Sequence, residues 1–405
     1  MPRDFPWRRF LPLAALLASI SVYTALILIQ ARSQHAVTMV DYWYHLQSAR
    51  ALSLTRLETW VHPFYPVGYF ALLRIGLDLG LDVARYGQFL SWSGSIGGIV
   101  AVYLLLYTAT RKAILALAGV ALLILHPFYR FQALQEGNDM LAAGLQLLAL
   151  AVVFSGDSDN RRHVFVTSAA AGIFLGGAYL IRYTALMLLP VIIACLWMKH
   201  RREKRTLAVS LTLLIGLFGL ISLPQLAAST AVTGSPFYNE QARNVWFGIY
   251  GDFNWTDNWQ NIPPNVTLAQ IVRDDPAAFF THWAQEIGRF LAYDPNAYAS
   301  DALALERKVT LWDPLLGHII WLVSVFMLLF NRRLSSPQIA LLLMTLMVPV
   351  LATSMAWLFT RYLLIALAIQ VVLIVLAARQ IGGWLARSDR AAIGVSLSLL
   401  LAFAL

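Results

Sequence analysis

Long apolar stretches separated by short charged segments dominate the chain. A helix that crosses a membrane needs about 20 mostly apolar residues, and eleven stretches meet this requirement. They begin near Phe10, Tyr86, Ala113, Met140, Val164, Tyr183, Thr206, Pro314, Gln338, Tyr362 and Ala391. The pattern predicts an all-α polytopic membrane protein with about eleven transmembrane helices.

One further apolar segment, residues 63–80, has an ambiguous pattern. Arg74 lies within it, and an arginine near the bilayer centre costs about 2.5–3.5 kcal/mol. The apolar run that follows Pro66 is also too short to cross. We therefore expect this segment to form an interfacial helix that lies on the membrane.

The distribution of Lys and Arg favours the same topology. If residues 63–80 do not cross, 17 of the 30 Lys and Arg residues fall in short segments on one side, together with only five of the 21 Asp and Glu residues. Short basic loops mark the cytoplasmic side. If residues 63–80 crossed, the basic run 199–205 would lie outside. We predict a cytoplasmic N-terminus, a retained signal anchor over residues 10–29, and interfacial helices in a first outer loop, residues 31–85.

Composition agrees with a membrane protein and excludes several other classes. Hydrophobic residues make up 59% of the chain and charged residues only 13%, with a mean hydropathy of +0.65, whereas soluble domains have about 25% charged residues. The net charge of +9 follows from the basic cytoplasmic loops, so we expect no nucleic-acid partner. The single cysteine, Cys195, excludes an internal disulfide framework.

Three acidic residues border apolar stretches on the predicted outer side. Asp41 follows the first stretch, and Glu136 and Asp139 precede the fourth. In a short helix after Asp41, His45 would share its face at i,i+4. Partial desolvation by neighbouring aromatic residues would raise the pKa of Asp41, which suits a general base.

Each of these acids also has a simpler interpretation. Asp41 and Asp139 are equally consistent with helix N-caps, because Asp is favoured there. The three carboxylates together are also compatible with a divalent cation held by oxygen ligands. Spacing alone does not separate these possibilities.

Two arginines, Arg182 and Arg361, lie between long apolar stretches on the predicted outer side. A guanidinium matches phosphate oxygens bidentately, so both are candidate phosphate-binding residues. The alternative is an arginine that faces lipid and extends its head group to the interface. Arg74 and His62 are further candidates for the same role.

The longest polar connection covers residues 227–313, and helices are expected within it over 268–292. Connections of this length are uncommon unless they are functional, and this one is large enough to cover a site. Asn244 and Trp246 lie within it as candidate substrate-binding residues. A tryptophan can stack on a sugar ring, although tryptophan is also enriched at membrane interfaces.

The ordered combination of motifs resembles the GT-C superfamily of polyprenyl-phosphate-dependent glycosyltransferases. The motifs are Asp41 after the first span, His62-Pro63-Phe64-Tyr65-Pro66, and Asp139 before the fourth span. The sequence is most similar to the branch of protein O-mannosyltransferases and aminoarabinose transferases. The resemblance covers about the first 200 residues and extends weakly to the region of Asn244 and to Arg361.

The resemblance implies roles for several residues. Asp41 matches the first-loop aspartate, the general base, and Asp139, with Glu136 nearby, matches the second-loop acid. His62 occupies the position at which relatives often have a lysine that meets the lipid phosphate. It also implies a catalytic transmembrane module over residues 1–226 and C-terminal transmembrane helices over 314–405.

We therefore expect an inverting hexosyl or pentosyl transferase in a membrane, which takes its sugar from a polyprenyl-phosphate donor. The acceptor would be a lipid, a glycan or a protein, and the site would face the periplasm or exterior, as in a bacterial inner membrane. No cofactor is expected, apart from a possible divalent cation. The alternatives are a transporter or flippase of a lipid-linked or anionic solute, and a non-catalytic scaffold. A transporter would carry ionisable residues at mid-membrane and matched broken helices.

Overall fold

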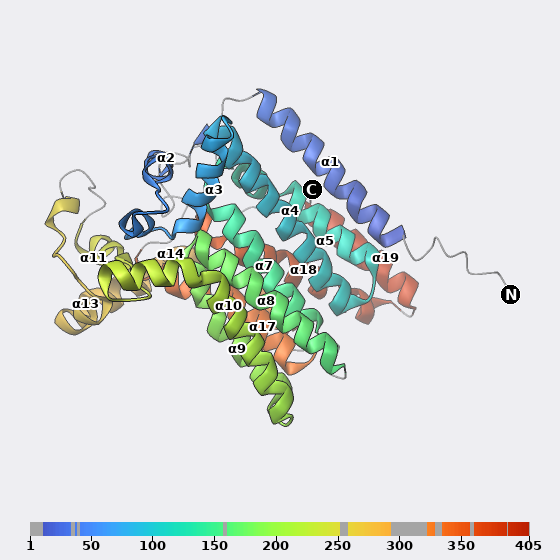
Figure 1. Ribbon diagram of the computed structural model, residues 1–405. Helices are drawn as coiled ribbons and strands as arrows, with labels where there is room; N and C mark the ends of the chain where they lie inside the picture. Colours follow the sequence, from blue (N-terminus) through green and yellow to red (C-terminus); the bar gives the residue numbers. More distant parts are fainter. Residues whose placement is uncertain are drawn as a thin grey trace.

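The computed structural model describes residues 11–33, 37–38, 41–156, 160–251, 258–292, 322–328, 334–356, 360–386 and 388–404. Long helices form a bundle, and shorter helices gather at one end of it (Figure 1). The first half contains α1 (Leu11–Ser33), β1 (Val37–Thr38), α2 (Tyr42–Ala51), η2 (Leu57–Trp60), α3 (Val67–Asp78), α4 (Val83–Thr110), α5 (Ala113–Leu125), α6 (Pro127–Leu134), β2 (Gln135–Glu136), α7 (Asp139–Ser155) and α8 (Arg161–Ile181). The second contains η3 (Tyr183–Met187), α9 (Leu188–His200), α10 (Lys204–Thr233), α11 (Gln241–Tyr250), η4 (Trp259–Asn261), α13 (Leu268–Asp274), α14 (Pro276–Ala292), α17 (Ser336–Thr353), η5 (Thr360–Leu363), α18 (Leu364–Leu385) and α19 (Asp389–Ala404).

Helices occupy ten of the eleven predicted apolar stretches. The remaining stretch, which begins near Pro314, lies outside the described residues apart from a helical piece at 322–328. Within the described ranges, seven helices are long and apolar enough to cross a membrane, or eight if α5 and α6, bent by 66°, form one span. The chain is thus a helical integral membrane protein, while the predicted count of about eleven spans is not confirmed.

The segment that was expected to lie on the membrane forms α3, a helix of 12 residues. Such a helix is about 18 Å long, well short of the hydrocarbon thickness of about 30 Å. It packs against α8 so closely that a Cβ on Gly68 would lie 2.5 Å from the carbonyl oxygen of Leu180. Its length and packing agree with the prediction that this segment does not cross.

The basic connections meet at the end of the bundle away from these short helices. Lys112, between α4 and α5, contacts Asp389, the first residue of α19, at 2.5 Å. Arg161, at the start of α8, lies 3.6 Å from Glu203, between α9 and α10. These loops therefore share one end of the bundle, as the charge distribution predicts. Which end faces the cytoplasm stays a prediction.

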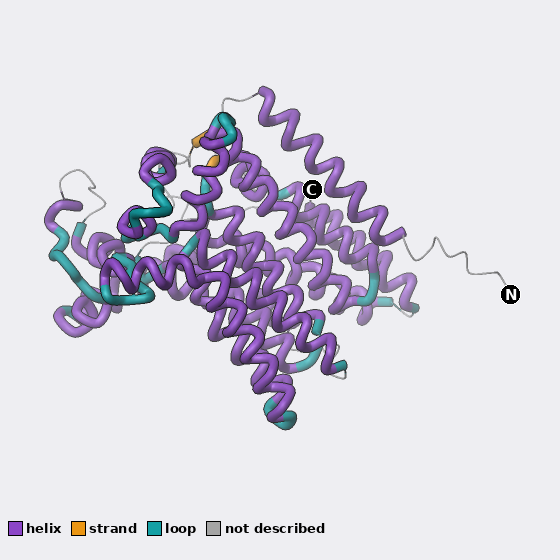
Figure 2. Tube along the Cα trace, in the orientation of Figure 1, coloured by secondary structure: helices purple, strands orange, loops and turns teal. Residues whose placement is uncertain are grey.

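A short strand pair and a close helix crossing fix the opposite end. Strands β1 and β2 pair in parallel, with Thr38 opposite Glu136 (Figure 2). Helices α4 and α7 cross at two glycines, where a Cβ on Gly144 would lie 2.1 Å from the carbonyl oxygen of Gly94. Small residues allow helix backbones to approach this closely. The strand pair brings the chain just before Asp41 beside the chain just before Asp139.

The long outer connection folds over the first outer loop. Helix α10 extends to Thr233, so the connection begins at Gly234 rather than at residue 227. The expected helices are present as α13 and α14. Ahead of α11, the N–H of Glu240 donates to the carbonyl of Pro63 at 2.8 Å. In α14, the imidazole Nε2 of His282 lies 2.6 Å from the carbonyl oxygen of Ala356. The connection is thus tied to the first outer loop and to the chain that leads to η5.

Candidate active site

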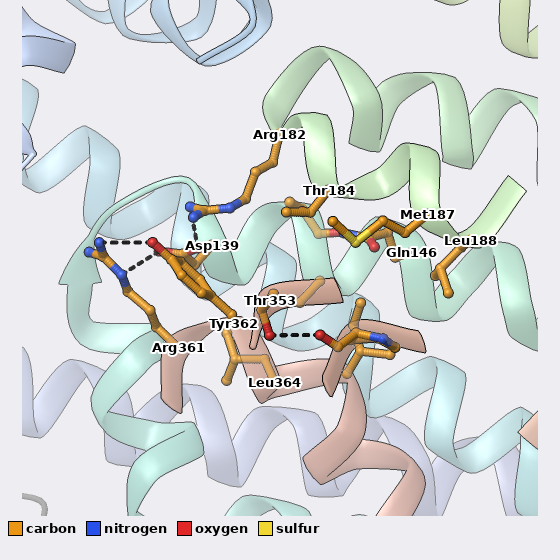
Figure 3. A pocket seen from close by; sticks show the side chains of 14 residues that line it. Asp139, Gln146, Arg182, Thr184, Met187, Leu188, Thr353, Arg361, Tyr362 and Leu364 are labelled. Carbon is orange, nitrogen blue, oxygen red and sulfur yellow. Dashed lines mark hydrogen bonds and ion pairs between the residues drawn. The ribbon is translucent and has the colours of Figure 1, made fainter. Parts of the chain in front are cut away.

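Two of the predicted carboxylates converge on one guanidinium. Asp41 lies directly before α2 and Asp139 is the first residue of α7, whereas Arg361 comes from η5 near the end of the chain. The Nη2 of Arg361 is 3.2 Å from an oxygen of Asp41, and its Nε is 3.9 Å from an oxygen of Asp139 (Figure 3). Residues far apart in the sequence therefore form one charged cluster.

Arg182 completes the cluster. It follows α8 directly and forms an ion pair with Asp139. Its Nη1 also donates to the side-chain oxygen of Asn138 at 2.9 Å. The guanidinium carbon atoms of Arg182 and Arg361 lie 4.6 and 5.3 Å from the ring centre of Tyr362, within the range of cation–π attraction.

The arginines do not have the position of lipid-facing residues. Their side chains are only 13% exposed for Arg182 and 21% exposed for Arg361, and both pair with carboxylates. An arginine that extends along lipid toward the interface keeps its head group in water. The structure therefore favours a role within the cluster for both.

The helix-cap interpretation of the two aspartates is also not supported. Asp41 occupies the N-cap position of α2, but its side chain makes no capping hydrogen bond within the described residues. The N-cap of α7 is Asn138 rather than Asp139. Both aspartates instead direct their carboxylates at arginines.

The expected pKa of Asp41 is wrong in sign. Burial raises the pKa of this carboxyl group, but the positive charge of Arg361 and the nearby His45 lower it, and so does a hydrogen bond from Tyr65. The result is a pKa below the ordinary value. In this arrangement Asp41 is a stably ionised carboxylate that an arginine already neutralises.

Glu136 and His45, which were expected to act on substrate, form a separate buried pair. Both side chains are fully buried, and His45 Nδ1 lies 3.4 Å from an oxygen of Glu136. The same oxygen accepts a hydrogen bond from the Tyr69 hydroxyl at 2.8 Å. The edges of the Tyr65 and Tyr69 rings pack against the imidazole, each with ring centres 5.0 Å apart. The Glu136 carboxylate is therefore enclosed by His45 and Tyr69 in the described structure.

His62 is neutral in this fold. Burial and the nearby His45 lower its pKa to about 4, against the opposing effect of the negative charge of Asp41. Its Nδ1 accepts hydrogen bonds from the backbone N–H groups of Phe64 and Tyr65, at 3.1 and 3.2 Å. His62 therefore shapes its own loop and supplies no positive charge for a phosphate near pH 7.

The other predicted residues have contacts outside the cluster. Arg74 pairs with Asp78 at 2.8 Å and reaches the carbonyl of Arg50, so it joins α3 to the end of α2. Asn244 donates to Gln241 at 2.9 Å within α11. Trp246 packs beside the buried Phe247, in an apolar cluster that also contains Tyr362. The aromatic residues of α11 thus form a cover that rests on the site.

The carboxylates do not gather in a set suited to a metal ion. Among the residues that the structure describes, no group of three or more His, Cys, Asp and Glu side chains is close enough to hold one. Asp41 and Asp139 direct their oxygens at Arg361 and Arg182, while Glu136 pairs with His45. The guanidinium of Arg361 contacts both aspartates, and that of Arg182 contacts Asp139.

A cavity adjoins the charged cluster. Asp139, Arg182, Arg361 and Tyr362 line one part of it, and mostly apolar side chains from α7, η3, α9, α17 and α18 line the rest (Figure 3). Atoms leave about 430 Å³ of space there, including the part open to solvent. The arrangement offers cationic groups beside an apolar pocket.

Sequence reasoning missed three residues of the site. Asn138 is buried and links Arg182 to the carbonyl of Ile181, to which it donates at 3.2 Å. Tyr362 lies beside both guanidinium groups, and Tyr65 donates a hydrogen bond to Asp41. Their position in the sequence could have indicated them, since each lies next to or within a motif already singled out.

No known protein family and no curated protein matches the sequence. Among solved structures, the chain is similar to "Crystal Structure of ArnT from Cupriavidus metallidurans in the apo state", with a TM-score of 0.37 and 13% identity. The similarity covers 94% of this chain and 76% of that one. A likeness of this size carries no argument about function, so the function is argued from the geometry of the site.

Proposed function

We propose that the chain is a membrane glycosyltransferase of GT-C type, which transfers a sugar from a polyprenyl-phosphate donor to an extracytoplasmic acceptor and inverts the anomeric configuration. One observation carries the proposal. Asp41 and Asp139, from loops about a hundred residues apart, meet Arg182 and Arg361 at the edge of an apolar cavity. This cluster combines a base with a cationic site for a phosphate that has an apolar tail.

The donor phosphate binds to the two arginines. A guanidinium presents a planar fork that matches phosphate oxygens, and the guanidinium carbons of Arg182 and Arg361 lie 4.6 and 5.3 Å from the centre of the Tyr362 ring. The apolar side chains beside the arginines contact the first carbon atoms of the polyprenyl chain, since the cavity itself is small. Because both arginines are paired with carboxylates in the donor-free protein, the phosphate competes with Asp41 and Asp139 for them.

This competition raises the pKa of Asp41, the proposed base. When the phosphate takes contacts of Arg361, the attraction that lowers the pKa of Asp41 weakens, and the pKa of its carboxyl group rises. Asp41 then accepts the proton of the acceptor hydroxyl as that oxygen attacks the anomeric carbon. The bond between that carbon and the phosphate oxygen breaks, and the lipid phosphate leaves with the electron pair. Arg182 and Arg361 stabilise its added negative charge.

The test compares two aspartate variants in the same strain background. Asp41→Asn removes the base, whereas Asp82→Asn is a matched control, because Asp82 caps α4 by accepting from the Arg85 N–H and Asn caps equally well. A bacterial strain lacking the chain is complemented with each, and its envelope glycolipids and glycans are measured by mass spectrometry. We expect Asp82→Asn to restore the missing sugar and Asp41→Asn to reduce the transfer rate about a hundredfold or more.

Two results would contradict the proposal. Full restoration of sugar transfer by the Asp41→Asn variant would show that Asp41 is not the general base. An unchanged set of glycolipids and glycans in the strain without the chain, accompanied by a redistribution of an intact lipid-linked sugar between the membrane leaflets, would instead identify a transporter or flippase.

A further inference from the structure

The buried carboxylate of Glu136 is not used by the proposed mechanism. Glu136 is fully buried, and it lies three residues before Asp139 in the chain. One of its oxygens accepts from Tyr69 and faces His45. Its other oxygen and the Nε2 of His45 are buried without a hydrogen-bond partner among the residues that the structure describes. Buried polar groups of this kind are costly, so their presence beside the site needs a reason.

The backbone of Glu136 contacts the chain on one side of Asp41, and its side chain contacts the chain on the other side. Upstream, Thr38 pairs with Glu136 in the two-stranded ladder. Downstream, the carboxylate faces His45, whose N–H donates to the carbonyl of Asp41 at 3.0 Å in the first turn of α2. Asp41 is therefore held between two contacts made by one residue.

The surrounding helices are shaped to hold this carboxylate. A Cβ on Gly87 of α4 would lie 2.5 Å from the Cγ of Glu136 and 3.2 Å from the Tyr69 hydroxyl. Only glycine leaves room for the Glu136 side chain at this point of α4. Strand β2 and helices α2, α3 and α4 thus all contribute to one buried site around Glu136.

We infer that Glu136 is a positioning residue that fixes Asp41 relative to Asp139, through the strand pair on one side and His45 on the other. This inference deepens the proposed function and rests on it. The two aspartates must keep a set separation for one guanidinium to reach both, at 3.2 and 3.9 Å. Glu136 maintains that separation because it touches the approach to Asp41 and lies within one short turn of Asp139.

Disturbing Glu136 should therefore lower the turnover rate without weakening donor binding. Glu136→Gln keeps an acceptor for Tyr69 but loses the negative charge that faces His45. Gly87→Ala leaves the carboxylate in the chain and displaces it by steric contact. Both variants leave Arg182 and Arg361 unchanged. Glu203→Gln is the matched control, since the Glu203 side chain is 45% exposed and its ion pair with Arg161 lies at the other end of α8.

The experiment uses the full chain in lipid nanodiscs and has two independent readouts. Hydrogen–deuterium exchange of residues 37–51 is measured first, because it does not depend on transferase activity. We expect exchange there to rise about fivefold in Glu136→Gln and Gly87→Ala, the factor that the loss of one ordinary hydrogen bond produces. Glu203→Gln is expected to match the wild type.

The second readout separates turnover from binding. Binding of undecaprenyl phosphate is followed by native mass spectrometry, and kcat and KM are measured with radiolabelled undecaprenyl-phosphate hexoses and pentoses and an envelope extract as acceptor. We expect Glu136→Gln and Gly87→Ala to lower kcat about tenfold or more, in the range of a misplaced base, while the affinity of the folded variants for undecaprenyl phosphate stays near that of the wild type.

The outcomes distinguish the two levels of the argument. Unchanged exchange over residues 37–51 in both variants, or an unchanged kcat, would overturn the role of Glu136. A loss of undecaprenyl phosphate binding as large as the loss of turnover would also overturn it, because it would place Glu136 at the substrate. If no donor supports transfer by the wild type, the proposed function fails, and the exchange measurement still decides whether Glu136 positions Asp41. If Glu136→Gln does not fold, Gly87→Ala decides.

Discussion

Replacing Arg361 by lysine keeps the positive charge of the site and removes its geometry. Two different nitrogen atoms of this guanidinium reach Asp41 at 3.2 Å and Asp139 at 3.9 Å. A lysine has one nitrogen on a flexible stem and cannot make both contacts, nor can it hold a phosphate through a planar fork. Arg361→Lys therefore tests whether the bridging geometry, rather than the charge, supports binding and transfer.

The magnitude follows from the contacts that are lost. A hydrogen bond to a charged group contributes about 1.5–3 kcal/mol to stability or binding, and about 1.4 kcal/mol corresponds to a tenfold change in affinity. Loss of one such contact to the donor phosphate should weaken binding by about ten- to a hundredfold. Removal of the whole side chain would cost more, because it would leave two carboxylates with fewer partners.

The assay is a titration of the purified protein with undecaprenyl phosphate, with undecaprenol as the uncharged control ligand. Arg74→Lys is the matched control, because Arg74 lies on the exposed side of α3 and pairs with Asp78. We expect Arg361→Lys to lose affinity for the phosphate and not for the alcohol, and Arg74→Lys to bind both as the wild type does. Equal affinities in Arg361→Lys and wild type would refute the reasoning, and so would an equal loss in Arg74→Lys.

Three further predictions concern stability and ions. The pKa of His62 is about 4, below its ordinary value of 6.5, so the unfolded chain takes up protons first on acidification. The melting temperature should then fall as the pH drops from about 6.5 toward 4, and it should fall less steeply in His62→Gln. The same dependence of melting temperature on pH in His62→Gln and wild type would argue against a neutral His62. Gly144→Ala should destabilise the protein by about 1–3 kcal/mol, because its new methyl group meets the Gly94 backbone. The control Gly219→Ala has open space around the new methyl group and should be neutral or slightly stabilising. Equal melting temperatures of the two variants would count against the tight crossing of α4 and α7. Because Asp41 and Asp139 already face guanidinium groups, we expect transfer to persist in excess EDTA, and inactivation that Mg²⁺ or Mn²⁺ reverses would show that a metal is required.

Hydrophobic pattern and charge distribution were sufficient to predict most of the fold. The apolar stretches within the described residues became helices, and the segment containing Arg74 became a helix of 12 residues, which agrees with the prediction that it does not cross. The grouping of Asp41, Asp139, Arg182 and Arg361 also agrees with a topology that placed them on the same side of the membrane. These features depend on quantities that a single sequence carries, namely hydropathy and the sign of charge in each loop.

The parts that sequence could not supply depend on the packing of segments from different regions. Nothing local to Glu136 indicates that Gly87 and Tyr69 enclose it, so a buried positioning role resembled a catalytic one. The pKa of Asp41 was predicted from its aromatic neighbours, but a guanidinium about 320 residues later in the sequence decides its direction. Arg74 resembled the other arginines in pattern, and only its contacts with Asp78 and Arg50 separate it from them.

The order in which these charges appear along the chain has a consequence for biogenesis. Asp41 and Asp139 precede both arginines, and Arg361 follows them by more than two hundred residues. A chain that inserts from its N-terminus gains Arg182, the partner of Asp139, soon after that residue, but the guanidinium that pairs with Asp41 arrives only with the last helices. Completion of the charge cluster is thus a late event in assembly, and chains released before residue 361 would present membrane quality control with an Asp41 that lacks its arginine partner.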